Sequence, residues 1–202
     1  MTHGEEFQRI LDVVKPSPDW RVLDVAAEAG RLKFTLRDFS SVIGGDAEKL
    51  PFADSSFDLV TCRAARYFAD VYRFAVEARR VLKHGGVLAV YDDLLPEEKR
   101  AGEYLNAFER LREPNFVCAY SESEWRSTFL DADFTVEDVE HMARRVNLEM
   151  WAGGCSAYVI ERLQILLAQA PQAVAAWLHP TCVGTRDASF EQKLMIITGK
   201  KN

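Results

Sequence analysis

Apolar residues recur at helical spacing near the start of the chain and then give way to short apolar runs. Residues 5–14 predict a helix because apolar side chains return every three or four positions, at Phe7, Ile10, Leu11 and Val14. Residues 21–26, RVLDVA, combine β-branched residues with one acid inside an apolar run. This pattern predicts a buried strand of a parallel sheet.

The next two segments predict a helix and a second strand. Residues 30–39 place Leu32, Leu36 and Phe39 on one helical face. Residues 40–46, SSVIGGD, form an apolar run that ends in glycines and an acid. We therefore expect the 40–46 strand to pair in parallel with the 21–26 strand. The crossover helix would have about ten residues, which is near the minimum for such a connection.

The alternation of strand and helix continues along the chain. Residues 57–63, FDLVTCR, predict a strand, and residues 70–82 predict an amphipathic helix with Asp70 as its N-cap. KHGG, residues 83–86, predicts a glycine C-cap for that helix, and residues 87–93 predict a further strand. Elements in this order predict an α/β protein with right-handed crossovers.

The second half of the chain is richer in helix. Helices are predicted over residues 97–113, 121–132 and 155–170, and strands over residues 134–142 and 193–200. No internal repeat or linker divides the sequence, so we expect a single domain over residues 1–202.

Composition and charge narrow the function classes. The chain is 48% hydrophobic and 28% charged, as in globular proteins, and its net charge is −6. The most basic run is Arg144-Arg145, which argues against contact with nucleic acid. The longest apolar run, around residues 163–176, is too short for a membrane span. The polar N-terminal sequence predicts no signal peptide.

Cysteine spacing argues against a metal site. The four cysteines form no Cys-x-x-Cys pair and suit no common zinc site: Cys62, Cys118, Cys155 and Cys182. We expect reduced thiols, no bound metal and a cytoplasmic location.

Four segments together carry a resemblance to a known family. They are RVLDVA at 21–26, GGDAEKLPFADSSFDLVTCR at 44–63, EARRVLKHGGVLAVYD at 77–92 and YSESEWRSTFLDADF at 120–134. They resemble the class I S-adenosylmethionine-dependent methyltransferases, within the small-molecule branch that includes the ubiquinone and menaquinone C-methyltransferases. The likeness covers residues 7–140.

The resemblance implies a Rossmann-like fold with a mostly parallel, doubly wound sheet, one antiparallel strand near the C-terminus and helical lid elements. S-adenosylmethionine would lie across the carboxyl ends of the strands. An acid that ends the second strand would bind the ribose hydroxyls. The resemblance places Asp24 and the loop that holds Ala26 and Gly30 under the methionine half, Asp46 and Ala47 beside the adenine, and Cys62 and Arg63 near the sulfur. A helix-capping role for Asp24 stays an alternative.

The cofactor loop departs from the family pattern, which reads Asp-x-Ala/Gly-x-Gly-x-Gly. Residues 24–30 read DVAAEAG, so only Gly30 is kept. A Cβ at a position that requires glycine costs about 1–2 kcal/mol of strain. Glu28 would also bring a carboxylate toward the carboxylate of the cofactor, unless it turns to solvent or faces the sulfonium. We therefore expect weak cofactor binding.

The chain is also shorter than the family pattern between the loop and the GDAEKLPF block. Only residues 31–45 separate Gly30 from Asp46, so one strand–helix unit is expected to be missing. Asp46 would then be the only candidate for the carboxylate that binds the ribose hydroxyls. It could not also keep the role beside the adenine that the resemblance gives it. The uncovered strand predicts a homodimer through the shortened sheet edge, with an apolar patch of Phe34, Phe39, Val42 and Ile43.

Candidate substrate residues come from the end of the 87–93 strand and from the helical half. They are Asp92, Tyr104 and Trp125, for which solvation and packing are the alternative roles. No catalytic residue is identified, because methyl transfer requires mainly positioning and exclusion of water. The sequence predicts a divergent methyltransferase of a small molecule. The alternative is a methyltransferase-like protein that has lost effective cofactor binding and serves as a ligand-binding or subunit-interaction module.

Overall fold

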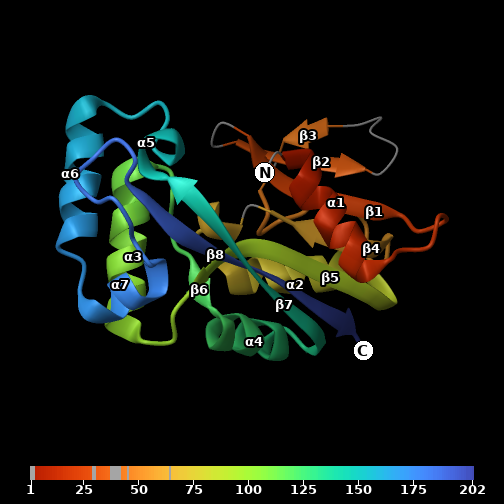
Figure 1. Ribbon diagram of the computed structural model, residues 1–202. Coiled ribbons are helices and arrows are strands. Elements are labelled where there is room, and N and C mark those ends of the chain that lie inside the picture. The colour runs from red at the N-terminus through yellow and green to blue at the C-terminus, as the bar shows by residue number, and fades with distance from the viewer. Residues whose placement is uncertain (1–2, 29–30, 37–41, 45, 64) are drawn as a thin grey trace. The chain divides into compact units, whose positions relative to one another are not determined.

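The computed structural model describes residues 3–28, 31–36, 42–44, 46–63 and 65–202 (Figure 1). The chain forms two compact units. Unit 1 comprises Met1–Asp92, Ser123–Glu140 and Met195–Asn202, and unit 2 comprises Asp93–Glu122 and His141–Leu194. A single domain over residues 1–202 stays a prediction.

Unit 1 is built on a sheet with the strand order β3-β2-β1-β4-β5-β8-β7. The strands are β1 Val22–Glu28, β2 Arg31–Leu36, β3 Val42–Gly44, β4 Phe57–Cys62, β5 Leu82–Leu95, β7 Phe134–Asn147 and β8 Ser189–Lys201. The last residues of β5 and β7 and the first of β8 belong to unit 2.

The centre of this sheet is parallel. Cys62 at the end of β4 lies opposite Val25 of β1 and Val90 of β5, in parallel register with both. Strands β7 and β8 run in opposite directions (Figure 1), and Thr135 of β7 exchanges side-chain hydrogen bonds with Asn202, directly after β8. The predicted α/β class, with an antiparallel strand near the C-terminus, is confirmed.

The edge of the sheet differs from the sequence prediction. Residues 31–36 form strand β2 and not a helix, and β2 runs antiparallel to β1 with Arg31 opposite Glu28. Strand β3 pairs with β2 in antiparallel register, so the predicted parallel pairing of residues 40–46 with β1 is also wrong. The run RLKFTL alternates apolar and polar residues as a strand does, although Leu32 and Leu36 also fit a helix. Residues 29–30 are too few for a crossover but suffice for a hairpin.

The described residues after β1 thus form an antiparallel edge of the sheet, in place of the predicted crossover helix and parallel strand. Among the described residues between β1 and β4 there is no helix. The predicted homodimer patch lies where no side chain is described, and Phe39 falls outside the described residues. Strand β3 is a terminal strand of the sheet order. A homodimer through this edge stays a prediction.

The described residues of unit 1 form the helical segments α1 His3–Val14, the 3₁₀ turn η1 Ala65–Tyr67, α2 Val71–Val81 and α4 Glu122–Asp131, of which only Glu122 is assigned to unit 2. Asp70 caps α2 as predicted, because its side chain accepts hydrogen bonds from the N–H groups of Tyr72 and Arg73. Helix α1 confirms the prediction over residues 5–14.

The predicted glycine C-cap of α2 is wrong. The helix ends at Val81, Leu82 is already extended, and residues 83–86 belong to β5. Gly85 has a φ of +76°, and a Cβ on Gly86 would lie 2.9 Å from the carbonyl oxygen of Lys83. The two glycines therefore allow the tightly packed backbone at the start of β5, and they do not cap the helix.

The core of unit 1 includes an aromatic group on α4 and β7. The ring centroids of Trp125 and Phe129 are 6.2 Å apart, and those of Phe129 and Phe134 are 5.6 Å apart. Gly199 of β8 lies against this group, since a Cβ there would come within 2.8 Å of the Phe129 Cε1 atom. The absence of a side chain at residue 199 lets the Phe129 ring pack onto the strand.

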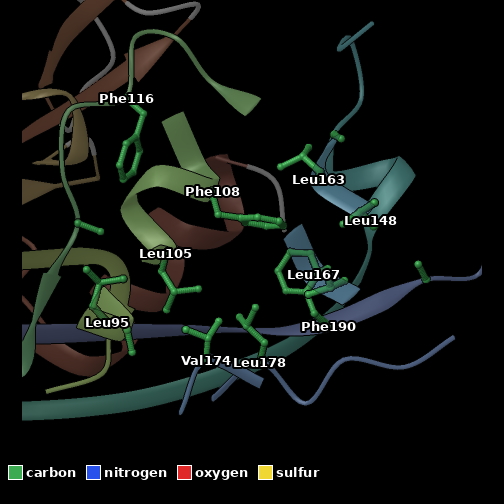
Figure 2. Close-up of a cluster of buried hydrophobic side chains, with 14 residues drawn as sticks. Leu95, Leu105, Phe108, Phe116, Leu148, Leu163, Leu167, Val174, Leu178 and Phe190 are labelled. Atoms are coloured by element: carbon green, nitrogen blue, oxygen red, sulfur yellow. The ribbon is translucent and has the colours of Figure 1, made fainter. Parts of the chain in front are cut away.

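Unit 2 is mainly helical. It contains α3 Lys99–Arg112, α5 Leu148–Trp151, α6 Ala157–Ala168, α7 Gln172–Leu178 and the short strand β6 Tyr120–Ser121, which pairs in parallel with the end of β5. Figure 2 shows the buried cluster of this unit, with side chains that include Leu105, Phe108, Leu163, Leu178 and Phe190. The predicted helices over 97–113 and 155–170 are confirmed, whereas α7 was not predicted. No helix in the described part of the chain is both long and apolar enough to cross a membrane.

Candidate functional site

A buried polar group lies where β1 and β4 run side by side. Asp24 of β1 is 7% exposed and sits opposite Thr61 of β4. Its carboxylate accepts a hydrogen bond of 2.7 Å from Thr61 Oγ1 and one of 2.5 Å from Arg63 Nη2. The backbone N–H of Arg63 also donates to the Val25 carbonyl oxygen at 2.9 Å, which fixes the backbone directly after β4 against β1.

The Arg63 guanidinium joins this group to the N-terminal helix. Its side chain is 7% exposed, and Nη1 lies 3.8 Å from Oε2 of Glu6. The guanidinium carbon also lies 5.8 Å from the ring centroid of Phe7. Two carboxylates therefore lie around one buried guanidinium, and loss of the Asp24 carboxylate would remove its 2.5 Å ion pair.

Three residues that the sequence assigned to the cofactor thus come together. Asp24, Arg63 and the fully buried Cys62 lie within the paired segments of β1 and β4 and the residue after β4. In the described part of the chain, the Asp24 carboxylate bonds to Thr61 and Arg63. The helix-capping alternative finds no support, since the element after β1 is a strand.

The loop residues give less information. Ala26 is part of β1, opposite Lys33 of β2. Gly30 lies outside the described residues, and nothing is described of the Glu28 side chain. The backbone nevertheless shows that β1 passes into an antiparallel strand. The segment after Asp24 therefore does not point a helix N-terminus at the site.

Asp46 and Ala47 form a turn directly after β3. The Glu48 N–H donates to Asp46 Oδ1 at 2.8 Å, and the Lys49 N–H donates to the Asp46 carbonyl oxygen at 3.1 Å. Ala47 is buried, while Asp46 is exposed. The Glu48 carboxylate accepts from the Asp70 N–H at 3.0 Å, so the start of α2 holds the turn in place.

Asp92 lies near the end of β5 and is fully buried. Its Oδ1 is 3.2 Å from Nε of Arg66, whose side chain is 14% exposed. Trp125, also predicted to contact substrate, is 1% exposed and packs edge-on against Phe129. Its observed contacts are those of a core residue, and its contact with substrate stays a prediction.

Unit 2 holds a small cavity of about 40 Å³ that sequence analysis did not single out. Its walls are mostly apolar and include Leu95, Leu105, Phe108, Leu178 and Phe190, all of which belong to the buried cluster in Figure 2. Asp93, only 5% exposed, also lines it. Gln192 Nε2 donates to Asp93 Oδ1 at 2.6 Å, and Arg144 Nε donates to Gln192 Oε1 at 2.8 Å.

A signal in the sequence could have separated the two acids. Successive residues of a strand point to opposite faces, so Asp92 and Asp93 require different surroundings. Asp92 meets Arg66 in unit 1, and Asp93 meets Gln192 in unit 2. The sequence offered both acids at the end of the 87–93 strand as possible substrate residues, and of the two only Asp93 lines the cavity of unit 2. Contact of either acid with substrate stays a prediction.

Tyr104 joins two helices of unit 2. Its hydroxyl donates to the Leu166 carbonyl oxygen at 2.7 Å, which links α3 to α6. Burial raises the pKa of Tyr104. This hydrogen bond gives the tyrosine a packing role, and its contact with substrate stays a prediction. Within the described residues, no group of three or more histidine, cysteine and acidic side chains could hold a metal ion.

Comparison with known proteins places this architecture in a family. Residues 7–90 match a methyltransferase domain family. The chain is 38% identical to the uncharacterized methyltransferase YcgJ of Bacillus subtilis, over 73% of this chain and 70% of the relative. The chain belongs to the class I methyltransferase family. It is also 32% identical to a demethylmenaquinone methyltransferase of Listeria monocytogenes, of whose length it spans 59%.

Solved methyltransferase structures agree with this assignment. The crystal structure of YcgJ matches with a TM-score of 0.74 and 33% identity, over 78% of this chain and 69% of that chain. A putative methyltransferase from Bacillus halodurans shares the fold, with a TM-score of 0.83 and 23% identity over 96% of this chain and 97% of that one. The Asp24–Arg63 group falls inside the matched methyltransferase domain.

Proposed function

We propose that the protein is an S-adenosylmethionine-dependent methyltransferase that acts on a small molecule. The observation that carries the proposal is the meeting of Asp24, Cys62 and Arg63 where β1 and β4 pair in parallel. In open α/β sheets, ligands bind outside the carboxyl ends of the strands. The buried charges of Asp24 and Arg63 lie where β1 and β4 pair, and they would suit a charged cofactor bound at the carboxyl ends of these strands.

The residues present fit S-adenosylmethionine in part. Asp24 and Arg63 would serve its amino-acid half, and the Asp46–Ala47 turn its adenosine half. The strand that follows β1 takes away the N–H donors that a helix N-terminus would offer to an anionic group. We therefore expect the protein to bind the cofactor at least about a hundredfold more weakly than a complete glycine loop would, which is roughly 3 kcal/mol.

Bound S-adenosylmethionine would supply a methyl group on a positively charged sulfur. The protein must hold the acceptor in line with that group and keep water out. Separately from this transfer, the cavity of unit 2 offers Asp93 as a hydrogen-bond acceptor among mostly apolar walls, and Gln192 holds the Asp93 Oδ1 atom in place. A cavity of about 40 Å³ holds water only, so a larger ligand of unit 2 would require lining side chains to move.

The hairpin after β1 favours a second candidate function. A chain without a helix at this position could keep the methyltransferase fold as a ligand-binding module with no effective cofactor site. This candidate differs from the first in one measurable property, the affinity for the cofactor.

Isothermal titration calorimetry with S-adenosylmethionine and S-adenosylhomocysteine tests the proposal. We expect saturable binding weaker than micromolar, and a further loss in Asp24→Asn. Asp187→Asn makes the same chemical change at an exposed loop residue of unit 2 and serves as the matched control. If neither compound binds the wild-type protein at millimolar concentration, the enzyme proposal fails and the ligand-binding module replaces it.

A further inference from the structure

The exposed face of helix α6 carries two apolar side chains in line. Tyr158 is 66% exposed and Ile165 is 43% exposed. Because seven residues are close to two turns of helix, these two side chains project from the same side. Leu163 and Leu167 project from the opposite side into the buried cluster of unit 2. The helix is therefore apolar on its packed face and also along the middle of its exposed face.

Two charged residues lie beside this apolar line. Glu161 and Arg162 are the only charged residues in the sequence of α6, and both are exposed. Since an α-helix has about 3.6 residues per turn, consecutive positions are about 100° apart around its axis. Glu161 and Arg162 therefore lie on the two flanks of the line from Tyr158 to Ile165, midway along it. Each flank carries one charge, and the two charges have opposite sign.

We propose that this face of α6 binds the same face of a second copy of the chain, with the two helices parallel and side by side. A two-fold axis that runs along the helices brings each flank of one helix against the opposite flank of the other. Glu161 then meets Arg162 of the partner subunit, and Arg162 meets Glu161 of the partner subunit. Tyr158 and Ile165 pack in the seam between these two ion pairs.

The charges select the parallel arrangement. If the two helices ran antiparallel, a two-fold axis would bring each flank against the same flank of the partner. Glu161 would then face a second glutamate and Arg162 a second arginine. Charges on the flanks of paired helices set their orientation and their choice of partner. The exposed face of α6 is therefore complementary to itself only when the helices are parallel.

The size of the face predicts a weak, reversible dimer. Helix α6 has 12 residues and is about 18 Å long. Helix α5, which packs against α6, carries a further apolar side chain, Met150, which is 83% exposed. One short helix offers less than the roughly 800 Å² per partner of a standard interface, so we expect the dimer to dissociate at micromolar concentration. Because α6 belongs to unit 2, this interface is separate from the sheet edge at β3.

The experiment reverses each of the two charges in a separate variant of the full chain. Glu161→Arg and Arg162→Glu each place like charges on both flanks, so each should weaken the dimer at least about tenfold in sedimentation velocity at low salt. An equimolar mixture of the two variants should restore the dimer, because each flank then joins opposite charges. Glu103→Arg reverses a charge at an exposed position of α3 and should dimerise as the wild type does.

Restoration by mixing also shows that both variants are folded. A wild-type protein that stays monomeric up to sub-millimolar concentration would overturn the proposal. The proposal also fails if neither charge reversal weakens the dimer, which would leave the sheet edge as the interface, or if the mixture of variants stays monomeric. These measurements need no cofactor, so they test this inference separately from the proposed function.

Discussion

Lys201 of β8 donates from Nζ to the carbonyl oxygen of Leu82 at 2.6 Å. The same ammonium group reaches the Arg79 carbonyl oxygen at 2.7 Å. These two carbonyl groups lie at the C-terminal end of α2, where a helix leaves its last acceptors without backbone partners. One side chain from the final strand therefore completes the end of a helix formed more than a hundred residues earlier.

Lys201→Met should destabilise unit 1 by about 1–3 kcal/mol, because it leaves these carbonyl groups without their charged donor. The neighbouring residue provides the control, since Lys200 is exposed and Lys200→Met should change the free energy of unfolding by less than about 0.5 kcal/mol. Urea denaturation followed by circular dichroism measures both. Equal midpoints for the two variants would contradict the capping role.

Gly86→Ala and Gly102→Ala should have opposite effects on stability. A Cβ on Gly86 would lie 2.9 Å from the Lys83 carbonyl oxygen and 3.2 Å from that of Asp58, so we expect a loss of about 1–3 kcal/mol. On Gly102, inside α3, the nearest atom would be 3.6 Å away, and alanine should stabilise the helix by about 0.5–1 kcal/mol. Thermal and urea unfolding report the sign of each change.

Asp24→Asn should cost about 3 kcal/mol of stability, because it removes the charged partner that lies 2.5 Å from the buried Arg63 guanidinium. Thr61→Val removes one hydrogen bond to the same carboxylate and keeps the charge pair, so about 1 kcal/mol is expected. The ranking of the two variants in denaturant midpoint is the test. A larger loss for Thr61→Val would show that the ion pair contributes little.

Stability at acid pH should depend on Glu191. Hydrogen bonds from Lys193 and with His179 lower the pKa of Glu191 from 4.5 to about 2. Since the folded-state pKa lies below the unfolded value, the stabilisation is fully present above about pH 4.5 and is lost as the pH falls toward 2. Glu191→Gln should abolish this part of the pH dependence. The midpoint difference between wild type and variant in urea should therefore shrink between about pH 5 and pH 2.5, and a constant difference would refute the assignment.

Local patterns predicted the elements whose ends are set by neighbouring residues. Asp70 could be recognised as a cap because its partners are the next residues along the chain. The RLKFTL segment could not be assigned in this way, since Leu32 and Leu36 satisfy both periods and pairing with β1 decides between them. Helix α7 has seven residues, which is too short for a reliable periodic signal.

In the candidate site, too, single residues could be predicted from the sequence but their contacts could not. Asp24 and Arg63 were separately predicted as site residues, but their ion pair depends on the register of β1 against β4, which is a long-range property. The roles of Glu6 and Gln192 had no local signal at all. Each becomes evident only when a helix or strand distant in sequence brings its partner within reach.

The contact between Gly199 and Phe129 has a consequence for sequence change over evolution. A side chain at residue 199 would occupy the space of the Phe129 ring, and the ring in turn fills the space that the glycine leaves. Substitution at one position should therefore be accepted only with a compensating change at the other. Across relatives of this chain, we expect these two positions to covary, with a large residue at 129 beside glycine at 199 or a smaller residue at 129 beside alanine or serine.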